Sequence, residues 1–269
     1  MNTYGETKQK EKEMEVYSGK RQQNRPDWGE QWDTESWYFL RRLTDGQKEE
    51  SELSHLPSEG PCLVVGVGGG YHSQILSRHL SYVIGFDIAR PEHRLDLSPN
   101  CERLVADAER LPFRDSSFTA IVCLGTLHHL PNPAVGVREM NRVSAENAAL
   151  VMHEPGLINP IALISRKVLP TQIHTPGERP FMLDELRDLV TQFYEIYEET
   201  EFHLVSLALP VFFKKARLPI KVKHVLILAT VRLEDSILRL KLFRGLASSF
   251  FFLAQKKRRQ QAEIGSYPA

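Results

Sequence analysis

The sequence CLVVGVGGGYHSQIL, residues 62–76, decides the expected fold of this chain. Its first four residues form an apolar run that suits a buried β-strand, and Ile75, Leu76 and Leu80 have helical spacing. The glycines between them can adopt positive φ and let a ligand approach the backbone. A strand, a glycine-rich turn and a helix together predict the start of a nucleotide-binding βαβ unit.

An acid follows the second expected strand, which spans residues 82–86. This acid, Asp87, comes about 20 residues after the glycines, where a carboxylate can accept both ribose hydroxyls of an adenosine. The glycines have the spacing G-x-G-x-G, at Gly66, Gly68 and Gly70. A dinucleotide site would need another glycine where Tyr71 stands, so the spacing disfavours an NAD-dependent oxidoreductase.

Two further stretches narrow the class of ligand. Residues 107–113 (DAERLPF) follow a third apolar run, and residues 118–124 (FTAIVCL) precede the sequence LHHL at 127–130. Together with the glycine turn and Asp87, in this order and spacing, they resemble the class I S-adenosylmethionine-dependent methyltransferases, in particular the small-molecule, quinone-biosynthesis-like type. The resemblance covers residues 60–155 well and the rest weakly. It implies S-adenosylmethionine as the cofactor.

The apolar runs alternate with helical patterns, which predicts parallel strands with helices on both faces. We therefore expect an α/β fold with a Rossmann-like, doubly wound and mostly parallel sheet. The resemblance further implies an antiparallel last strand, near residues 249–254. A helical N-terminal segment and a helical insertion before the last strand, at about 210–246, would complete the fold. The family usually has a Pro-Gly-Gly turn before the fifth strand, and here we expect Asn147 to supply the left-handed residue.

The chain has 269 residues, of which 42% are hydrophobic, enough for one α/β domain with additions. Residues 1–45 are expected to form a mobile arm and a helical lid, in which residues 37–40 either cover the pocket or pack a helix on the sheet. A solvated connection is expected at 44–60. A single methyltransferase domain is expected at 46–269. Its cofactor-binding half would lie at 60–155, the substrate-side cover with the helical insertion at 156–246, and the last strand with a basic tail at 247–269.

The resemblance also implies roles for residues of each motif. The three glycines of the turn would lie against the methionine and ribose parts of the cofactor, and Asp87 would hold the ribose hydroxyls. Asp107 would accept from the adenine amino group, Ala108 would offer its backbone N–H to the ring, and Leu124 would make a backbone contact. One position departs from the family: Val65 stands where an acid commonly helps to hold the cofactor's ammonium group.

Methyl transfer from a sulfonium is an in-line displacement, so the protein mainly positions the acceptor. A general base is needed only if the acceptor must lose a proton, as a hydroxyl does. We assign catalytic roles to His129, which follows the fourth strand, and to Glu154 at the end of the fifth, as base or as a group that orients the acceptor. His129 could instead be a structural hydrogen-bonding group. Other candidates are His128, His153 and His174. No metal site is predicted, because the paired histidines lack further ligands at a recognisable spacing.

The C-terminal region is basic although the chain as a whole has 34 basic and 34 acidic residues. Between residues 214 and 259 there are thirteen Lys and Arg against Glu234 and Asp235. With apolar residues interleaved, this composition suits a basic amphipathic helix on an anionic membrane, or a site that attracts an anionic acceptor. The alternative is an ordinary charged face balanced by the acids at 184–201. No RNA-binding signature is present, which disfavours nucleic acid as a partner.

The N-terminus is polar, and no apolar run approaches the ~20 residues of a membrane span. We therefore expect a cytoplasmic protein with peripheral membrane contact through the basic region, and reduced thiols at Cys62, Cys101 and Cys123. The predicted function is S-adenosylmethionine-dependent methyl transfer to a small-molecule, glycan-precursor or lipid-linked acceptor. The alternative is a non-catalytic methyltransferase-like domain that binds a partner or an anionic surface through its basic insertion.

Overall fold

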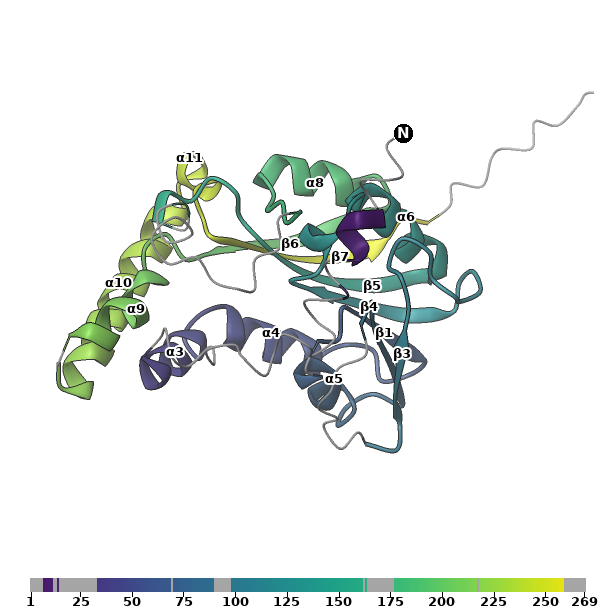
Figure 1. Cartoon of the computed structure of the whole chain (residues 1–269), viewed down its shortest axis with the longest axis horizontal. Helices are drawn as coiled ribbons and strands as arrows, with labels where there is room; N and C mark the ends of the chain where they lie inside the picture. Colours follow the sequence, from purple (N-terminus) through teal and green to yellow (C-terminus); the bar gives the residue numbers. More distant parts are fainter. Residues whose placement is uncertain are drawn as a thin grey trace, which may run out of the picture.

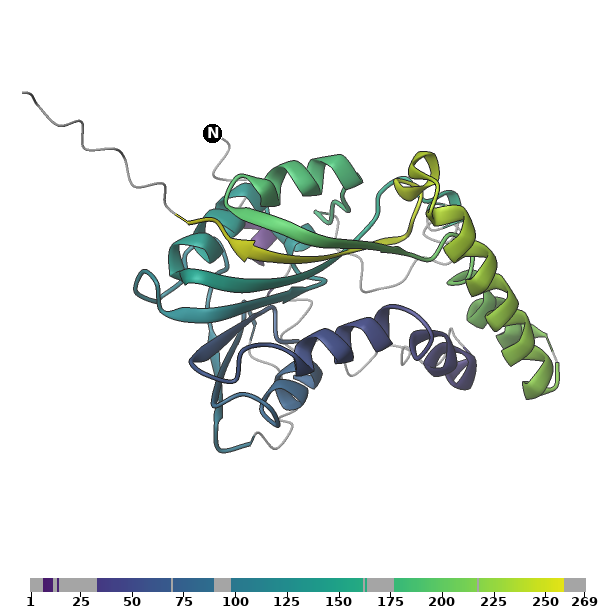
Figure 2. The same cartoon turned by 180° about the vertical axis from the view of Figure 1, so that it is seen from behind.

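A seven-stranded sheet with the order β3-β2-β1-β4-β5-β7-β6 forms the centre of the protein in the computed structural model (Figures 1 and 2). The structure describes residues 7–11, 14, 33–68, 70–89, 98–161, 163, 177–216 and 218–258. The strands are β1 (Pro61–Val65), β2 (Tyr82–Asp87), β3 (Cys101–Val105), β4 (Phe118–Leu124), β5 (Ser144–Pro155), β6 (Tyr194–Phe202) and β7 (Ser249–Lys256). The first five strands run parallel, and β7 is antiparallel to both of its neighbours. The expected Rossmann-like fold with an antiparallel last strand is confirmed.

Helices cover both faces of the sheet, with α4 and α5 on one face and α6 and α8 on the other (Figure 1). The described helices are α3 (Thr34–Arg41), α4 (Asp45–Ser54), α5 (Tyr71–Leu76), the 3-10 helix η2 (Leu127–His129), α6 (Pro133–Val143), α8 (Leu183–Thr191), α9 (Ala208–Lys215), α10 (Ile220–Leu238) and α11 (Lys241–Arg244). The helical insertion before the last strand is confirmed as α9 to α11. None of the helices in the described ranges has the length and apolarity to cross a membrane.

The central strands are apolar along both faces because both are covered. In β1, Leu63 and Val65 belong to the core beneath α6 and α8, whereas Cys62 and Val64 belong to the core beneath α4 and α5. All three cysteines are buried free thiols. The expected left-handed residue before the apolar part of β5 is also present, since Asn147 has φ of 58°. Local sequence signals thus determine the central sheet.

The segment before β1 differs from the expectation. Residues 44–60 were expected to be solvated, but α4 lies within them and buries Asp45, Glu49 and Leu53. These three positions are spaced by four residues, so they share one face of the helix. The expectation was wrong because it treated charged side chains as solvated, whereas Asp45 and Glu49 have charged partners inside the protein.

The aromatic stretch at residues 37–40 forms part of α3, and this helix packs against the insertion. Leu40 shares a hydrophobic cluster with Phe213 of α9 and with Ile227 and Val231 of α10. Phe39 stacks on His224 with 3.8 Å between the ring centroids. The described apolar partners of this stretch come from the C-terminal insertion rather than from the sheet, so the expectation that it packs a helix on the sheet was wrong. Its role as a lid stays a prediction.

Candidate cofactor and active site

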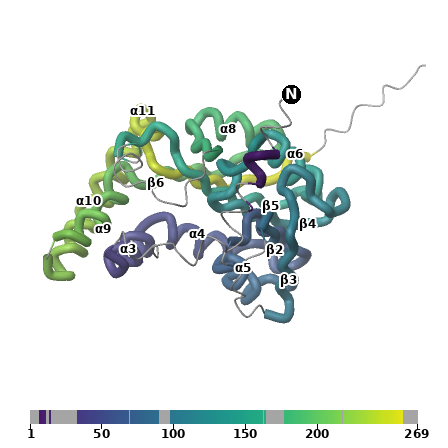
Figure 3. The backbone as a smooth tube through the Cα atoms, viewed as in Figure 1, coloured from purple at the N-terminus to yellow at the C-terminus, as the bar shows by residue number. Residues whose placement is uncertain are grey.

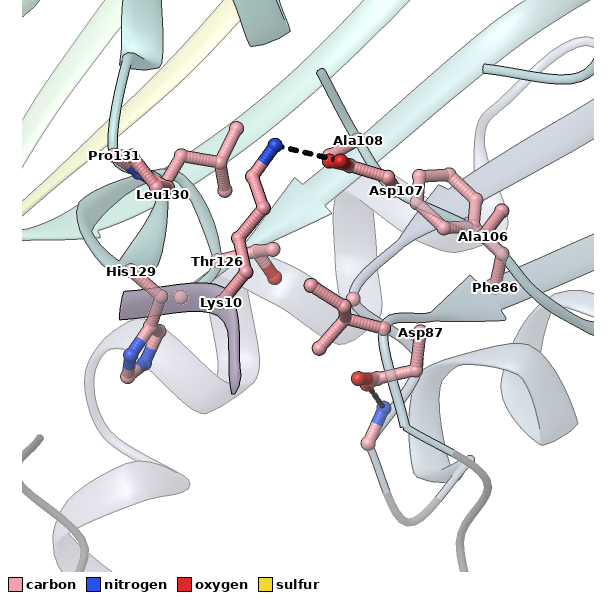
Figure 4. A pocket seen from close by; sticks show the side chains of 14 residues that line it. Lys10, Phe86, Asp87, Ala106, Asp107, Ala108, Thr126, His129, Leu130 and Pro131 are labelled. Carbon is pink, nitrogen blue, oxygen red and sulfur yellow. Dashed lines mark hydrogen bonds and ion pairs between the residues drawn. The ribbon is translucent and has the colours of Figure 1, made fainter. Parts of the chain in front are cut away.

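A pocket opens at the carboxyl ends of the parallel strands, where the strand order reverses between β1 and β4. Ligands of open α/β sheets bind at such a switch point. The pocket is lined by residues that follow β1, β2, β3 and β4, and by one residue from the N-terminal segment (Figure 4). They are Lys10, Gly66, Gly68, Phe86, Asp87, Ile88, Ala106, Asp107, Ala108, Gly125, Thr126, His129, Leu130 and Pro131.

The three glycines of the turn have different structural roles. Gly68 has φ of 46° and lines the pocket, and a Cβ there would meet no atom within 4 Å, so the turn leaves open space for a ligand. A Cβ on Gly66 would lie 1.9 Å from Oγ1 of Thr126, so this glycine makes room for a protein side chain. Gly70 does not line the pocket; with φ of 90° it precedes the first residue of α5. Of the three expected contacts, the geometry favours Gly68 most.

Asp87 is held at the mouth of the pocket by the glycine turn. Its Oδ2 accepts a hydrogen bond of 2.9 Å from the backbone N–H of Gly68 (Figure 4). Its Oδ1 accepts one of 3.4 Å from the backbone N–H of Ala89. A carboxylate has about four lone-pair positions, so two remain for a ligand. This is the arrangement that the ribose-binding expectation requires.

Asp107 follows β3 and lies across the pocket from the glycine turn. Its Oδ1 accepts a hydrogen bond of 2.9 Å from the backbone N–H of Glu109, and its Oδ2 lies 2.6 Å from Nζ of Lys10. Lys10 Nζ also lies 2.5 Å from Oε2 of Glu109. Burial by itself lowers the pKa of Lys10, but the two carboxylates outweigh it and raise the pKa. The ammonium group therefore stays charged and engages Asp107 (Figure 4).

The segment at residues 7–11 lies beside the loop between β4 and α6 (Figure 3). Nε2 of Gln9 donates to the backbone carbonyls of His129 and Gly177, at 3.0 and 3.1 Å. The sequence suggested a mobile arm here, and the described part of it is instead held at the pocket. Lys10 and Gln9 gave no sequence signal, because they belong to a charged run without a motif.

His129 lines the pocket, as the sequence predicted for the candidate base. Its Nδ1 lies 3.5 Å from Oε1 of Glu178, and its ring lies 4.0 Å, centroid to centroid, from that of His128. Nδ1 of His128 lies 2.7 Å from Oε2 of Glu154. Catalysis by His129 stays a prediction, and the acidic neighbour Glu178 is an addition that sequence reasoning did not weigh as its partner.

Glu154 lies behind the pocket wall. Its buried carboxylate accepts hydrogen bonds from the backbone N–H groups of Leu127 and Thr126, at 2.7 and 3.0 Å. Burial alone would raise the pKa of this carboxyl, but the His128 ring and the backbone donors hold it below its ordinary value. Glu154 thus fixes the turn that carries pocket residues. This geometry fits a positioning role, and direct contact with an acceptor stays a prediction.

Three other sequence-derived residues have clear places. Ala108 lines the pocket next to Asp107. Leu124 packs against the core beneath α4 and α5, and the next residue, Gly125, lines the pocket in its place. A Cβ on Gly125 would meet no atom within 4 Å, so a glycine directly after a strand was the available signal. Val65 is buried in the core and supplies no polar group to the pocket.

His153 points to the opposite face of the sheet from Glu154. Its Nδ1 lies 2.7 Å from Oε1 of Glu49, which also pairs with Arg41. Asp45 lies 3.3 Å from Nε2 of His203. We call these five side chains the α4 charge cluster: Arg41, Asp45, Glu49, His153 and His203. The remaining candidate base, His174, lies outside the described residues.

Two groups of side chains bring three potential metal ligands within 4.8 Å of one another. One consists of His128, His129 and Glu178, and the other of Asp45, Glu49 and His153. In the second group Glu49 and Asp45 already pair with Arg41, His153 and His203. Because protein cations compensate these carboxylates, we assign no metal to them.

Comparison with known proteins agrees with this geometry. Residues 63–152 match the family model described as a methyltransferase domain. Over 123 residues the chain is 28% identical to proteins named probable tRNA methyltransferase 9B from Mus musculus and Bos taurus. The match covers 45% of this chain and 25% of each relative, so the chain spans about a quarter of the length of these relatives.

Solved structures share the fold at low sequence identity. A Thermotoga maritima S-adenosylmethionine-dependent methyltransferase, described as a possible histamine N-methyltransferase, superposes with a TM-score of 0.55 at 16% identity, over 91% of this chain and 99% of its own. The cyclase SpnF superposes with a TM-score of 0.55 at 18% identity, over 80% of each chain. Residues 63–152 thus match a methyltransferase domain, and the chain shares its fold with S-adenosylmethionine-dependent methyltransferases. The quinone-biosynthesis-like subtype stays a prediction.

The cofactor of such methyltransferase domains is S-adenosylmethionine, and the pocket fits it. The open space above Gly68 and Gly125 admits a ligand to the backbone, and Asp87 and Asp107 present carboxylates from the ends of two adjacent strands. The apolar residues Phe86, Ile88 and Leu130 complete the lining in a way that suits a flat, partly apolar ring.

Proposed function

We propose that the protein transfers a methyl group from S-adenosylmethionine to a small-molecule, glycan-precursor or lipid-linked acceptor. One observation carries the proposal: Asp87 and Asp107, which come from two different strand ends, face the same pocket as the glycine turn. A nucleoside with hydroxyls at one end and an amino group at the other requires acceptors at both ends. The pocket supplies them.

The residues of this chain would act mainly by binding and orientation. S-adenosylmethionine supplies an activated methyl group when bound. Asp87 would accept the ribose hydroxyls, Asp107 the adenine amino group once Lys10 has left it, and Gly68 would let the ligand lie against the turn. His129, next to Glu178, would take a proton from a hydroxyl acceptor. The buried Glu154 would keep the turn that carries His129 and Thr126 in place.

A non-catalytic domain on the same scaffold is the second candidate. Two observations favour it: Val65 replaces the usual acid, and Lys10 occupies the carboxylate of Asp107. The structure also superposes on a cyclase, which illustrates that this fold can serve more than one function. A domain of this kind would bind a partner or an anionic surface through the basic insertion and would have no use for the cofactor.

Calorimetric titration of the purified chain separates the two candidates. Micromolar binding of S-adenosylmethionine and S-adenosylhomocysteine, with no binding of NAD, supports the methyltransferase and justifies a screen of acceptors. Lack of binding by both sulfur ligands, repeated with a Lys10→Met variant to exclude simple blockage of the pocket, would refute it in favour of the scaffold.

A further inference from the structure

The helix α10 is held rigidly at the edge of the molecule far from the strand β3 (Figures 1 and 2). Ile227 and Val231 on its inner side pack with Leu40 of α3 and Phe213 of α9. Glu234, also on the inner side, is buried and accepts a hydrogen bond of 2.7 Å from the backbone N–H of Ser206. These contacts fix the orientation of α10, and they therefore also fix which face of the helix points away from the protein.

This outward face is apolar, although it does not contact the described core. Large aliphatic side chains recur along it at helical spacing and are between 41% (Leu226) and 65% (Val225) exposed. Leu242, in α11, extends the stripe and is 84% exposed. We call this stripe the α10 outer face, formed by Val222, Val225, Leu226, Leu233, Leu240 and Leu242. A helix with one buried apolar face and a second, exposed one indicates a contact outside the monomer.

Basic residues accompany the stripe. Lys221, Arg232 and Arg239 are exposed, and their spacing of eleven and seven residues puts them on nearly the same side of the helix, along one edge of the apolar stripe. Lys241 is exposed beside Leu240 and Leu242. Asp235, exposed four residues before Arg239, offsets one of these charges, so the surface keeps a net positive charge.

The acids at residues 184–201 neutralise a different side of the insertion. Arg244 lies 3.5 Å from Glu199 and from Glu201, and a second basic residue, Lys223, pairs with Asp33 near α3. These contacts belong to the inner side, where α10 and α11 meet the body. The acids that were considered as a balance for the basic region thus do not explain the bases of the outer face.

We propose that the α10 outer face docks on an anionic membrane surface. The aliphatic stripe would enter the boundary between headgroups and acyl chains, and Lys221, Arg232, Arg239 and Lys241 would lie among anionic headgroups. RNA fits less well, because the centre of the surface is aliphatic and offers no row of aromatic rings for stacking bases. A second copy of the chain fits less well too, because it would bring two positive edges together.

The test is co-sedimentation of the full chain with vesicles of phosphatidylcholine, alone or mixed three to one with phosphatidylglycerol. We expect binding to the mixed vesicles, little binding to the neutral ones, and weaker binding as salt is added. Arg232→Gln with Arg239→Gln should lower the partition constant about 25-fold, at roughly fivefold for each base. Val225→Gln with Leu233→Gln should lower it at least about tenfold.

Matched controls exist elsewhere on the surface. Tyr197, on the edge strand β6, is as exposed as Val225, at 65%, so Tyr197→Gln tests the loss of an exposed apolar side chain outside the stripe. Arg78→Gln with Arg114→Gln removes two exposed charges from other parts of the molecule. Both control proteins should bind the mixed vesicles as the unmodified chain does. Circular dichroism checks that every variant is folded.

Several outcomes would overturn the proposal. One is the absence of binding to mixed vesicles. Another is a partition constant that is unchanged both by Val225→Gln with Leu233→Gln and by Arg232→Gln with Arg239→Gln. A dimer in light scattering that Leu233→Gln converts to a monomer would assign the face to a second copy. RNA binding that depends on these arginines, without vesicle binding, would assign it to nucleic acid. Cofactor titration is a separate measurement, so docking and methyl transfer can fail independently.

Discussion

The carboxylates of the cofactor pocket and those of the α4 charge cluster are the same chemical groups in opposite settings. The side chain of Asp107 is 34% exposed and that of Glu49 only 5%. Glu49 has its oxygens engaged by Arg41, His153 and His72, all fixed parts of the fold. Asp87 keeps lone pairs that the protein does not fill. Carboxylates near the same edge of a sheet can thus be available to bind a ligand or can stabilise the fold. Their burial and their charged partners decide which.

The largest effect is expected for Glu49→Ala. The substitution leaves the Arg41 guanidinium and the His153 ring in a buried site without their carboxylate, which should cost about 3 kcal/mol of the free energy of unfolding. Denaturant unfolding followed by circular dichroism measures it. The control is Glu52→Ala on the same helix, where the pair with Lys48 is more exposed and should contribute about 0.5 kcal/mol. Equal costs for the two variants would contradict the assigned role of the cluster.

The pH dependence of stability sharpens this comparison. Burial would raise the pKa of Glu49, but hydrogen bonds from His153 and His72 and the charge of Arg41 hold it far below its ordinary value. A depressed carboxyl pKa stabilises the protein above the unfolded value of about 4.3, and this contribution is lost as pH falls through the folded value. The stability difference between the unmodified chain and Glu49→Gln should therefore be full at pH 6 and shrink below pH 4. A difference that stays constant would refute the ionic contribution.

Asp87→Ala should have the opposite profile, with a large loss of affinity and little loss of stability. We expect affinity for S-adenosylmethionine to fall about 100-fold, because two charged hydrogen bonds to the ribose are removed together. Calorimetry measures the affinity and thermal unfolding the stability. The control is Asp115→Ala, which should leave the affinity unchanged. The side chain of Asp115 is 73% exposed and pairs with Arg142. An unchanged affinity in Asp87→Ala would refute the ribose assignment.

Asp107→Ala should weaken cofactor binding by about 1–3 kcal/mol, typical of a polar contact left unpaired. We expect a value in the lower part of this range, below the loss for Asp87, because Asp107 must first give up the ion pair with Lys10. The same calorimetric titration measures it. Equal affinity for this variant and the unmodified chain would show that the adenine amino group is read elsewhere.

The smallest effect is a gain. Lys10→Met should tighten cofactor binding about threefold, because the lysine no longer competes for the carboxylate of Asp107. Lys8→Met, an exposed position on the same segment, is the matched control. In an Asp107→Ala background the gain should disappear, since the competition needs both partners. Weaker binding in Lys10→Met would instead make Lys10 a part of the cofactor site.

The sequence predicted the cofactor half well because its signals are local. The glycine spacing, the apolar runs and an acid directly after a strand all lie within a few residues of one another. Asp87 could be placed from its position at the end of a strand, and Asp107 was placed in the same site by the resemblance to the family. The left-handed Asn147 followed from an equally local pattern, whereas the antiparallel β7 followed from the resemblance to the family.

Tertiary structure decided the features that join distant parts of the chain. Lys10 meets Asp107 across 97 residues, and Glu49 meets His153 across 104. Hydropathy treats such side chains as solvated, because a charge becomes buried only when a partner arrives from elsewhere in the fold. Likewise, α10 has apolar residues on two faces, and its sequence alone did not predict which face would pack on α3 and which would stay exposed. The sequence by itself determined the sheet and the place of Asp87 at the end of β2, and the packing of distant segments decided which side chains pair at the pocket and which face outward.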